Sequence, residues 1–383
     1  MTPTLNIDKS NWKKYRFGDV AIQTKEVVDI ENTTLDRYIA GEHIDSEDLH
    51  IRRWGIVGDG YLGPAFIRKF SKGDILYGSR RTYLKKVAIA DFDGITANTT
   101  FVIKPTELIH PILLAHLMLS EKFTEYSVKN SRGSVNPYIN WKDIADYEFL
   151  LPPLAEQQRL AELLWAADEM IEKEKRELEG VERMLQSILN ENVNVEGQPK
   201  ISYADLVEVN PSTKMEIEEV SLITMADVSE SGDIINQEKI RVSDMKGKGL
   251  TPFQENDILF AKITPCMENG KGAIAQNLFN GFGLGSTEFH VLRPKLLSDL
   301  YYCYFLSKSQ PFRKIAEKLM TGTAGQKRVQ VEFFDFYKLQ APSKEQRKTI
   351  GERLFEVDSN ISMLKRQISL SQQIEQELIN KMF

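Results

Sequence analysis

Several short stretches of this sequence combine basic side chains with aromatic or amide groups. The groups are Arg80, Arg81, Tyr83, Lys85 and Lys86; Arg52 and Arg53 beside Trp54; Lys262 and Lys271; and Gln326, Lys327 and Arg328. Lysine and arginine bind phosphates, while arginine and glutamine also pair with base edges in the major groove. For any one such cluster alone, an ordinary solvated loop is the favoured interpretation. Because similar clusters occur in both halves of the chain, we predict that these residues contact DNA.

The sequence contains no recognisable catalytic or cofactor-binding motif. Residues 136–138 (Asn-Pro-Tyr) are one proline short of an amino-methyltransferase motif and are interpreted as a turn. The glycine- and lysine-rich segments 246–249 and 268–272 lack the spacing of a phosphate-binding P-loop. The five histidines form no HExxH or other metal-ligand pattern. We therefore predict a protein that is not an enzyme and that binds neither a metal nor a cofactor.

The residues that would contact DNA must be positioned by a domain that occurs twice. The segment FSKGDILYGSR (70–80) resembles FQENDILFAKI (253–263), and residues 94–105 resemble 283–294. Residues 131–153 likewise align with 320–342, which places Gly133 over Gly322. Two copies are too few for a solenoid, so the pattern indicates one duplicated globule.

Each copy is predicted to be a mixed domain of short strands with a helix. In the first copy we expect strands at 87–89 and 100–103 and a helix at 111–129. In the second we expect strands at 253–260 and 287–292 and a helix at 300–319. Asp74 and Asp257 occupy the same place in the repeat, before an apolar strand, and we interpret both as turn residues rather than as catalytic groups.

Two long helices are predicted, one after each globule. Apolar residues recur at alternating steps of three and four in 151–191 and in 341–383, which is typical of helices that pair along a narrow seam. Glu174 is the one polar residue in the first seam. Each helix follows proline, which is tolerated in a first turn. About 38 residues at 1.5 Å per residue would span roughly 57 Å.

The expected fold is α+β, with two pseudo-repeated mixed α/β domains separated by two long antiparallel coiled-coil helices. The predicted boundaries are 1–151 and 197–341 for the domains, and 152–196 and 342–383 for the helices. Four large apolar residues lie near or beside the helix seam, and we predict that they bind other proteins: Trp165, Met170, Met184 and Phe355.

The composition is that of a globular protein acting inside the cell. Of 383 residues only two are cysteines, the sequence has no apolar run of membrane-spanning length, and its polar start is no signal peptide. A cytoplasmic location is therefore expected. The formal charge of −6 does not exclude a DNA partner, because the acidic excess lies in 152–199 while both globules are nearly balanced.

Taken together, these motifs resemble the specificity subunit of type I restriction-modification systems. The resemblance rests on the GDIL and NDIL strands, the Gly-Ser or Gly-Thr loop in each globule, and the Glu-Gln pair that follows proline at each long helix. It implies two target recognition domains that each read half of a split double-stranded DNA site. It also implies docking of two adenine methyltransferase subunits on the helices and association with motor-nuclease subunits. Those partners would bind S-adenosylmethionine, ATP and Mg²⁺, and this chain would bind no cofactor.

Three other interpretations remain open from the sequence. The chain could be the specificity subunit of a type IIB system, which neighbouring genes would distinguish. It could be a nuclease or methyltransferase in its own right, although that requires a motif we do not find. It could also be a coiled-coil adaptor that binds only proteins, but this would leave the duplicated globule unexplained.

Overall fold

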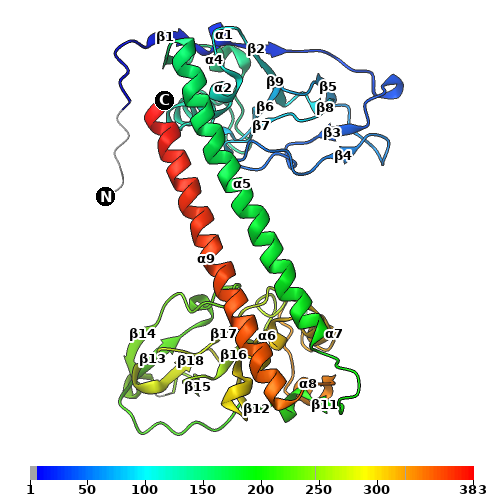
Figure 1. Cartoon of the computed structure of the whole chain (residues 1–383), viewed down its shortest axis with the longest axis vertical. Coiled ribbons are helices and arrows are strands. Elements are labelled where there is room, and N and C mark those ends of the chain that lie inside the picture. The colour runs from blue at the N-terminus through cyan, green and yellow to red at the C-terminus, as the bar shows by residue number, and fades with distance from the viewer. Residues whose placement is uncertain (1–6, 246, 324) are drawn as a thin grey trace. The chain divides into compact units, whose positions relative to one another are not determined.

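The computed structural model describes residues 7–245, 247–323 and 325–383. These residues form two compact units: the first extends to Lys175 and also contains Arg366–Phe383, and the second is Arg176–Lys365. Two long helices, α5 (Leu154–Glu191) and α9 (Lys344–Met382), each contribute one end to each unit (Figure 1). The turn predicted at 246–249 includes Lys246, which lies outside the described residues.

The first unit contains two four-stranded sheets. One has the order β2 (Ala21–Thr24), β9 (Thr100–Pro105), β6 (Ile75–Gly78), β7 (Val87–Ile89), and the other β4 (Gly55–Ile56), β3 (Arg37–Ile39), β8 (Gly94–Ala97), β5 (Phe66–Phe70). All neighbouring strands are antiparallel except β3 and β8, which are parallel. The remaining elements are β1 (Lys13–Arg16) paired with β10 (Glu148–Leu151), α1 (Phe17–Val20), α2 (Pro111–Leu117), α3 (Glu121–Lys129), α4 (Trp141–Ala145), η1 (Ile30–Asn32) and η2 (Thr82–Leu84).

The second unit repeats this topology strand for strand. Its sheets have the orders β12 (Val207–Val209), β19 (Phe289–Pro294), β16 (Ile258–Ala261), β17 (Gly272–Ile274), and β14 (Glu238–Arg241), β13 (Glu219–Ile223), β18 (Phe282–Gly285), β15 (Thr251–Gln254). The one parallel pair, β13 with β18, occupies the corresponding place. The other elements are β11 (Ile201–Ser202) paired with β20 (Lys338–Leu339), α6 (Leu300–Lys308), α7 (Gln310–Lys318), α8 (Glu332–Phe336), and five 3₁₀ turns: η3 (Tyr203–Asp205), η4 (Met225–Asp227), η5 (Val242–Met245), η6 (Phe279–Gly281), η7 (Leu297–Asp299). The predicted duplication is therefore confirmed.

Three predicted elements are each divided in the structure. The helix expected at 111–129 ends at Leu117, and Ser120 caps a second helix by accepting a hydrogen bond from the Phe123 N–H. The helix expected at 300–319 is interrupted at Ser309, whose backbone is extended, before Pro311 in the first turn of α7. The strand expected at 253–260 is wrong, because Asn256 has a φ of +68° and starts a turn between β15 and β16.

Aromatic residues fill the core of each unit. In the first unit, Phe17, Tyr77 and Phe123 lie at most 1% exposed beneath residues of both long helices, including Leu164 and Ile379. In the second unit, the corresponding core contains Phe260, Phe312 and Phe334 and again includes residues of both long helices. Each domain is thus anchored on the helix pair by its own hydrophobic core. No helix in the described residues is long and apolar enough to cross a membrane.

The predicted helix seam is present in both units. In the second unit, Leu178 and Val181 of α5 pack in the same core as Val357 and Ile361 of α9. In the first unit, the polar position Glu174 is buried, and its Oε1 accepts a hydrogen bond of 2.6 Å from Gln367 Nε2. The lapse in the apolar pattern is therefore a paired polar contact, the type of contact that fixes register between two helices.

Candidate nucleic-acid interface

The densest basic cluster lies on the loop between β6 and β7 of the first unit. Arg80, Arg81 and Tyr83 are exposed, and Arg81 has a left-handed backbone with a φ of +49°. Among the described residues, neither arginine side chain has a hydrogen bond or ion pair within the chain. The two guanidinium groups are therefore available to bind phosphates or bases.

A second loop, residues 133–137, is joined to this one. Arg132 and Tyr138 close it by exchanging backbone hydrogen bonds of 2.8 and 2.9 Å, and the Arg81 N–H donates to the Pro137 carbonyl at 2.7 Å. The interpretation of 136–138 as part of a turn is thus confirmed. The loop exposes Asn136 and the aromatic ring of Tyr138, which sequence reasoning did not include among the binding residues. The alignment of 131–153 with 320–342 could have identified it.

The second unit brings its two predicted clusters together in the same way. Thr321 and Arg328 pair through backbone hydrogen bonds of 2.8 and 3.0 Å and so close a loop whose described residues are 322–323 and 325–327. This loop lies against the β16–β17 loop, because Val329 N–H donates to the Lys262 carbonyl and Thr264 N–H to the Lys327 carbonyl. Gln326 and Lys327 are exposed, and Lys262 is partly exposed. Both units therefore present a pair of connected loops that carry basic and amide side chains.

Some of the predicted binding residues are instead held by partners within the chain. Lys85 is 8% exposed and its Nζ donates to Glu121 at 2.5 Å and to Glu47 at 2.7 Å. Lys86 Nζ donates to the Gly41 carbonyl. In the second unit, Lys271 Nζ donates to the Met225 carbonyl at 3.1 Å.

Arg328 is likewise paired. Its guanidinium donates to both carboxylate oxygens of Glu288 at 2.8 and 2.9 Å, and these hydrogen bonds raise the pKa of Arg328. For Lys85, Lys86, Lys271 and Arg328 the structure therefore provides a role in positioning the loops that carry the exposed groups.

Sequence reasoning missed the buried cation that holds the second unit's β16–β17 loop. Arg313 of α7 is 6% exposed and donates to the carbonyls of Ser307, Met267 and Lys271 at 2.8, 2.8 and 3.2 Å. The guanidinium also lies over the Phe260 ring, 4.3 Å from its centroid. Burial lowers the pKa of Arg313 to about 10, so the side chain stays charged at neutral pH. No local pattern marks such a residue.

His290 supports the base of the same loop pair. Its Nδ1 lies 3.0 Å from Asn210 Nδ2, and its Nε2 lies 2.9 Å from the Val329 carbonyl. Nδ1 therefore accepts and Nε2–H donates, which defines a neutral ring. Burial also lowers the pKa of His290, so this contact persists in the neutral form.

The third predicted cluster, Arg52 and Arg53, lies in a network between the 45–53 loop and α5. Arg52 bonds Asp48 at 2.9 Å and Glu172 at 2.6 Å, Lys175 bonds Glu172 at 3.0 Å, and Arg53 pairs with Asp45. Burial favours a higher pKa for Glu172, but the hydrogen bonds from Arg52 and Lys175 outweigh it and lower that pKa to about 2. Arg52 is therefore committed to an internal ion pair.

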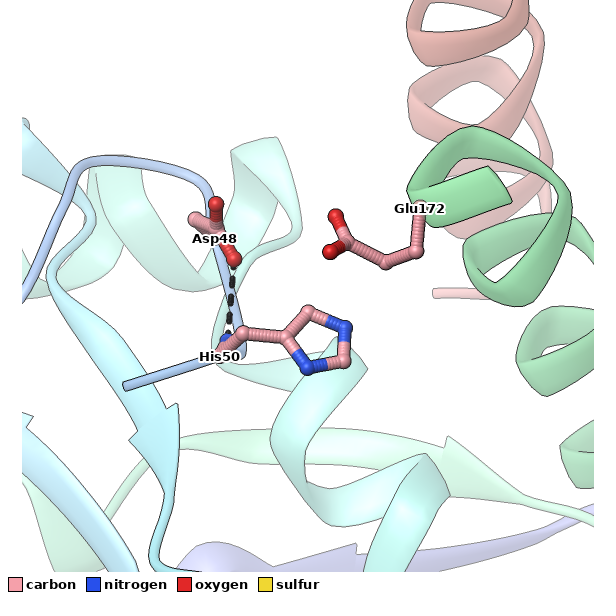
Figure 2. Close-up of side chains that lie close together, drawn as sticks. All are labelled: Asp48, His50 and Glu172. Atoms are coloured by element: carbon pink, nitrogen blue, oxygen red, sulfur yellow. Dashed lines mark hydrogen bonds between the residues drawn. The ribbon is translucent and has the colours of Figure 1, made fainter. Parts of the chain in front are cut away.

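Figure 2 shows the Asp48, His50 and Glu172 side chains of this network. Their potential ligand atoms lie within 4.8 Å of one another, as in a metal site. However, Arg52 and Lys175 already neutralise both carboxylates. His50 Nε2 bonds Asp168 Oδ2 at 2.8 Å, which raises the pKa of His50. A cation would have to displace these partners, so the group is better described as an ion-pair network.

All four predicted docking residues are exposed on the long helices. Trp165 is 38% and Met170 50% exposed on α5 in the first unit, while Met184 is 42% and Phe355 40% exposed in the second. Trp165 lies beside His50, with ring centroids 6.5 Å apart, and Phe355 stacks on Tyr301 at 4.3 Å. Each unit therefore presents one supported aromatic ring on a long helix.

Comparison with known proteins agrees with this architecture. A family model described as "Type I restriction modification DNA specificity domain" matches residues 9–183 and again residues 194–376. Among curated proteins, the Escherichia coli type I restriction enzyme EcoEI specificity subunit is 37% identical over 161 residues, 41% of this chain and 27% of that protein. The EcoAI specificity subunit of Escherichia coli is 37% identical over 179 residues, 45% of this chain and 30% of that protein. The alignments thus cover less than a third of either relative.

Two solved structures share the fold. One, titled "Structural basis underlying complex assembly and conformational transition of the type I R-M system", has a TM-score of 0.57, 19% identity and coverage of 97% of each chain. The other, a type I restriction-modification S subunit from M. genitalium, has a TM-score of 0.58 at 14% identity and covers 100% of this chain and 99% of that one. At these identities the similarity shows the fold alone.

Proposed function

Because this chain belongs to the type I restriction-modification DNA specificity family, we propose that it is the sequence-specificity subunit of a type I restriction-modification complex. The observation that carries the proposal is the pair of connected loops that occurs at corresponding places in both units. Each loop pair reads one half of a split site in double-stranded DNA. The matching family favours this function over a type IIB subunit or a protein-only adaptor.

We assign base and phosphate contacts to the exposed members of the loop pairs. In the first recognition domain these are Arg80, Arg81, Tyr83, Asn136 and Tyr138; in the second they are Lys262, Gln326 and Lys327. Arginine and the two amides suit base edges, lysine suits phosphates, and the tyrosines can stack or donate to phosphates. The internally paired Lys85, Lys86, Lys271 and Arg328 would orient these loops rather than touch bases. Arg52 and Arg53 would instead hold the 45–53 loop through their own ion pairs.

Catalysis is assigned to partner subunits. Two adenine methyltransferases would dock on the long helices at Trp165 and Met170 in one place and at Met184 and Phe355 in the other, since exposed aromatic and methionine side chains are common in protein interfaces. Motor-nuclease subunits would complete the complex, which acts in the cytoplasm. S-adenosylmethionine, ATP and Mg²⁺ would bind to those partners and not to this chain.

The helices between the recognition domains act as a spacer in this proposal. Segments 152–196 and 342–383 carry the spacer, and 1–151 and 197–341 carry the two readers. A continuous helix of 38 residues spans roughly 57 Å, compared with about 34 to 36 Å for one turn of B-DNA. The target is therefore expected to contain two specified parts separated by unread base pairs.

The test is to map methylated adenines in DNA from cells that contain this chain and its methyltransferase. The expected result is a single bipartite motif that disappears when the chain is deleted. Exchanging residues 12–150 for those of a relative should change only one half of the motif. An undivided motif, or methylation that persists unchanged without this chain, would contradict the proposal.

A further inference from the structure

One buried histidine in the first unit has an unused ring nitrogen. His116, in the last turn of α2, is fully buried, and its Nδ1 lies 2.7 Å from the Ile112 carbonyl oxygen. Nδ1 therefore carries a proton and donates it, so that in the neutral ring the lone pair lies on Nε2. Within the described residues, Nε2 has no hydrogen-bond partner. Histidines that ligate a metal through one ring nitrogen typically donate the N–H of the other ring nitrogen to a backbone carbonyl or a carboxylate.

The group that faces this nitrogen is a carboxylate from the C-terminal helix. Glu375 Oε1 of α9 lies 3.7 Å from His116 Nε2, beyond hydrogen-bond distance. A lone pair and a carboxylate repel each other unless positive charge lies between them. Nitrogen and oxygen ligands at about 2.1 Å from one metal ion are about 3.4 to 3.7 Å apart when the angle at the metal is about 110° to 125°. The observed separation fits two ligands of a single ion.

Glu375, but not His116, lines a hollow whose water could supply the remaining ligands. This hollow has a volume of about 300 Å³, enough for several water molecules, and its wall includes Asp45, Glu47, Asp48 and Asp168. Those four carboxylates are bound by Arg53, Lys85, Arg52 and His50 respectively. Among the described residues of the hollow, Glu375 differs from them because its one ionisable partner is His116.

We propose that His116 Nε2 and Glu375 bind one divalent transition-metal ion, with water from the hollow completing its coordination. An imidazole with a carboxylate suits Zn²⁺, Co²⁺ or Ni²⁺ better than Mg²⁺, which prefers a shell of oxygen ligands. The ion would connect α2, which packs on the first domain's sheet, to the C-terminal part of α9. It would thereby stabilise the attachment of this domain to the helix. The inference does not depend on the proposed DNA-reading function.

The experiment measures Zn²⁺ binding to the tag-free full chain by calorimetry, together with the thermal unfolding temperature and the visible spectrum of the Co²⁺-loaded protein. The wild-type chain should bind one Zn²⁺ and gain about 2 to 4 °C in Tm at saturation. Its Co²⁺ spectrum should indicate a low-symmetry site with nitrogen ligation. Glu375→Gln and His116→Gln should each weaken binding at least tenfold and remove the Tm gain.

Two control variants make the outcome specific. Glu377→Gln changes an exposed carboxylate on the same helix, and His50→Gln alters the Asp48–His50–Glu172 group, so both should retain binding. If His116→Gln does not fold, Glu375→Gln carries the test, because Glu375 is partly exposed at the rim of the hollow. The proposal is overturned if the wild-type chain binds no Zn²⁺, since His116 would then be an imidazolium paired with Glu375. It is equally overturned if binding survives in Glu375→Gln or is lost in His50→Gln alone.

Discussion

Two buried cations hold the proposed reading loops. One of them is part of its loop, and the other lies on a helix that contacts its loop. Lys85 belongs to the loop of the first domain and reaches Glu121 at the start of α3. Arg313 belongs to α7 and reaches the carbonyls of the loop in the second domain. Removing a buried group of this kind leaves carbonyls or carboxylates without donors, which is costly. Both residues are expected to affect DNA reading without touching DNA.

Arg313→Lys should impair discrimination at the half-site read by the second domain. Lysine keeps the charge but cannot donate to three carbonyls in the planar geometry of a guanidinium. We expect preference for the matched half-site over a mismatched one to fall about tenfold, which corresponds to about 1.4 kcal/mol. The salt dependence should be unchanged, because no phosphate contact is lost. Binding of the assembled complex to both DNAs over a salt series provides the measurement, with Lys314→Arg on the exposed side of α7 as the control.

Changing Arg80 and Arg81 to alanine should act directly on binding. If they contact bases, affinity for the half-site read by the first domain should fall by about 1 to 3 kcal/mol per contact, and a lost phosphate contact should also reduce the salt slope. The other half-site should still be discriminated. Lys72→Ala, in an exposed turn elsewhere in the domain, is the control. Unchanged affinity with an unchanged salt slope would show that these arginines do not face the DNA.

Among the larger elements, the ion-pair network joins the 45–53 loop to α5 within the first unit. His50 has a raised pKa because it bonds Asp168, and Glu172 has a pKa lowered to about 2 by Arg52 and Lys175 against the effect of burial. The two groups therefore stabilise the folded state over different pH ranges. The His50 contribution is complete below the ordinary pKa of 6.5 and is lost as pH rises through its raised pKa. The Glu172 contribution is complete above 4.5 and is lost as pH falls towards 2.

Asp168→Asn should therefore destabilise the protein more in mildly acidic than in alkaline solution. The variant removes the charge that favours protonated His50. The loss in its free energy of unfolding relative to wild type should therefore shrink as pH rises past the pKa of His50. Denaturant unfolding of the first unit, measured at pH values on both sides of that pKa, gives the comparison. Glu169→Gln, an exposed neighbour on α5, should show no such trend. A loss of unfolding free energy in Asp168→Asn that does not vary with pH would refute the claim that Asp168 stabilises protonated His50.

At the scale of the whole molecule, both long helices pass from one compact unit to the other. If they determine the spacing of the two readers, inserting four helix-forming residues after Lys175 and four after Lys365 should lengthen both helices by about 6 Å. That is at most about two base pairs of B-DNA. An insertion of four is a stutter that keeps an apolar stripe in register better than an insertion of five.

The measurement for this insertion is a genome-wide map of methylated adenines. The bases read in each half-site should stay the same, and the number of unread base pairs between them should increase. Four residues inserted after Gly197, in the exposed segment that follows α5, lengthen the chain without lengthening a helix and should leave the spacing unaltered. Activity at the original spacing in the double-helix insertion would show that another part of the complex sets the distance.

The duplication and the paired helices could be predicted from the sequence, because both depend on local patterns. A heptad stripe marks a helix wherever it lies, and α5 (Leu154–Glu191) covers the apolar stripe found in residues 151–191. The GDIL and NDIL segments are likewise similar because each must form the same turn before a strand. Asp74 and Asp257 each accept a hydrogen bond from a backbone N–H three residues earlier, which closes the turn before the strand. These turn assignments needed no knowledge of distant contacts.

Only the tertiary structure decided which basic residues remain available for DNA. Arg52, Lys85 and Arg328 resemble Arg80 and Lys327 in sequence, yet each is neutralised by an acidic residue between 36 and 120 positions away. An ion pair depends on which remote segments the fold brings within a few ångströms, and no local pattern encodes that proximity. The same reason explains why the buried Arg313 and the pairing of His116 with Glu375 became visible only once distant strands and helices were packed together.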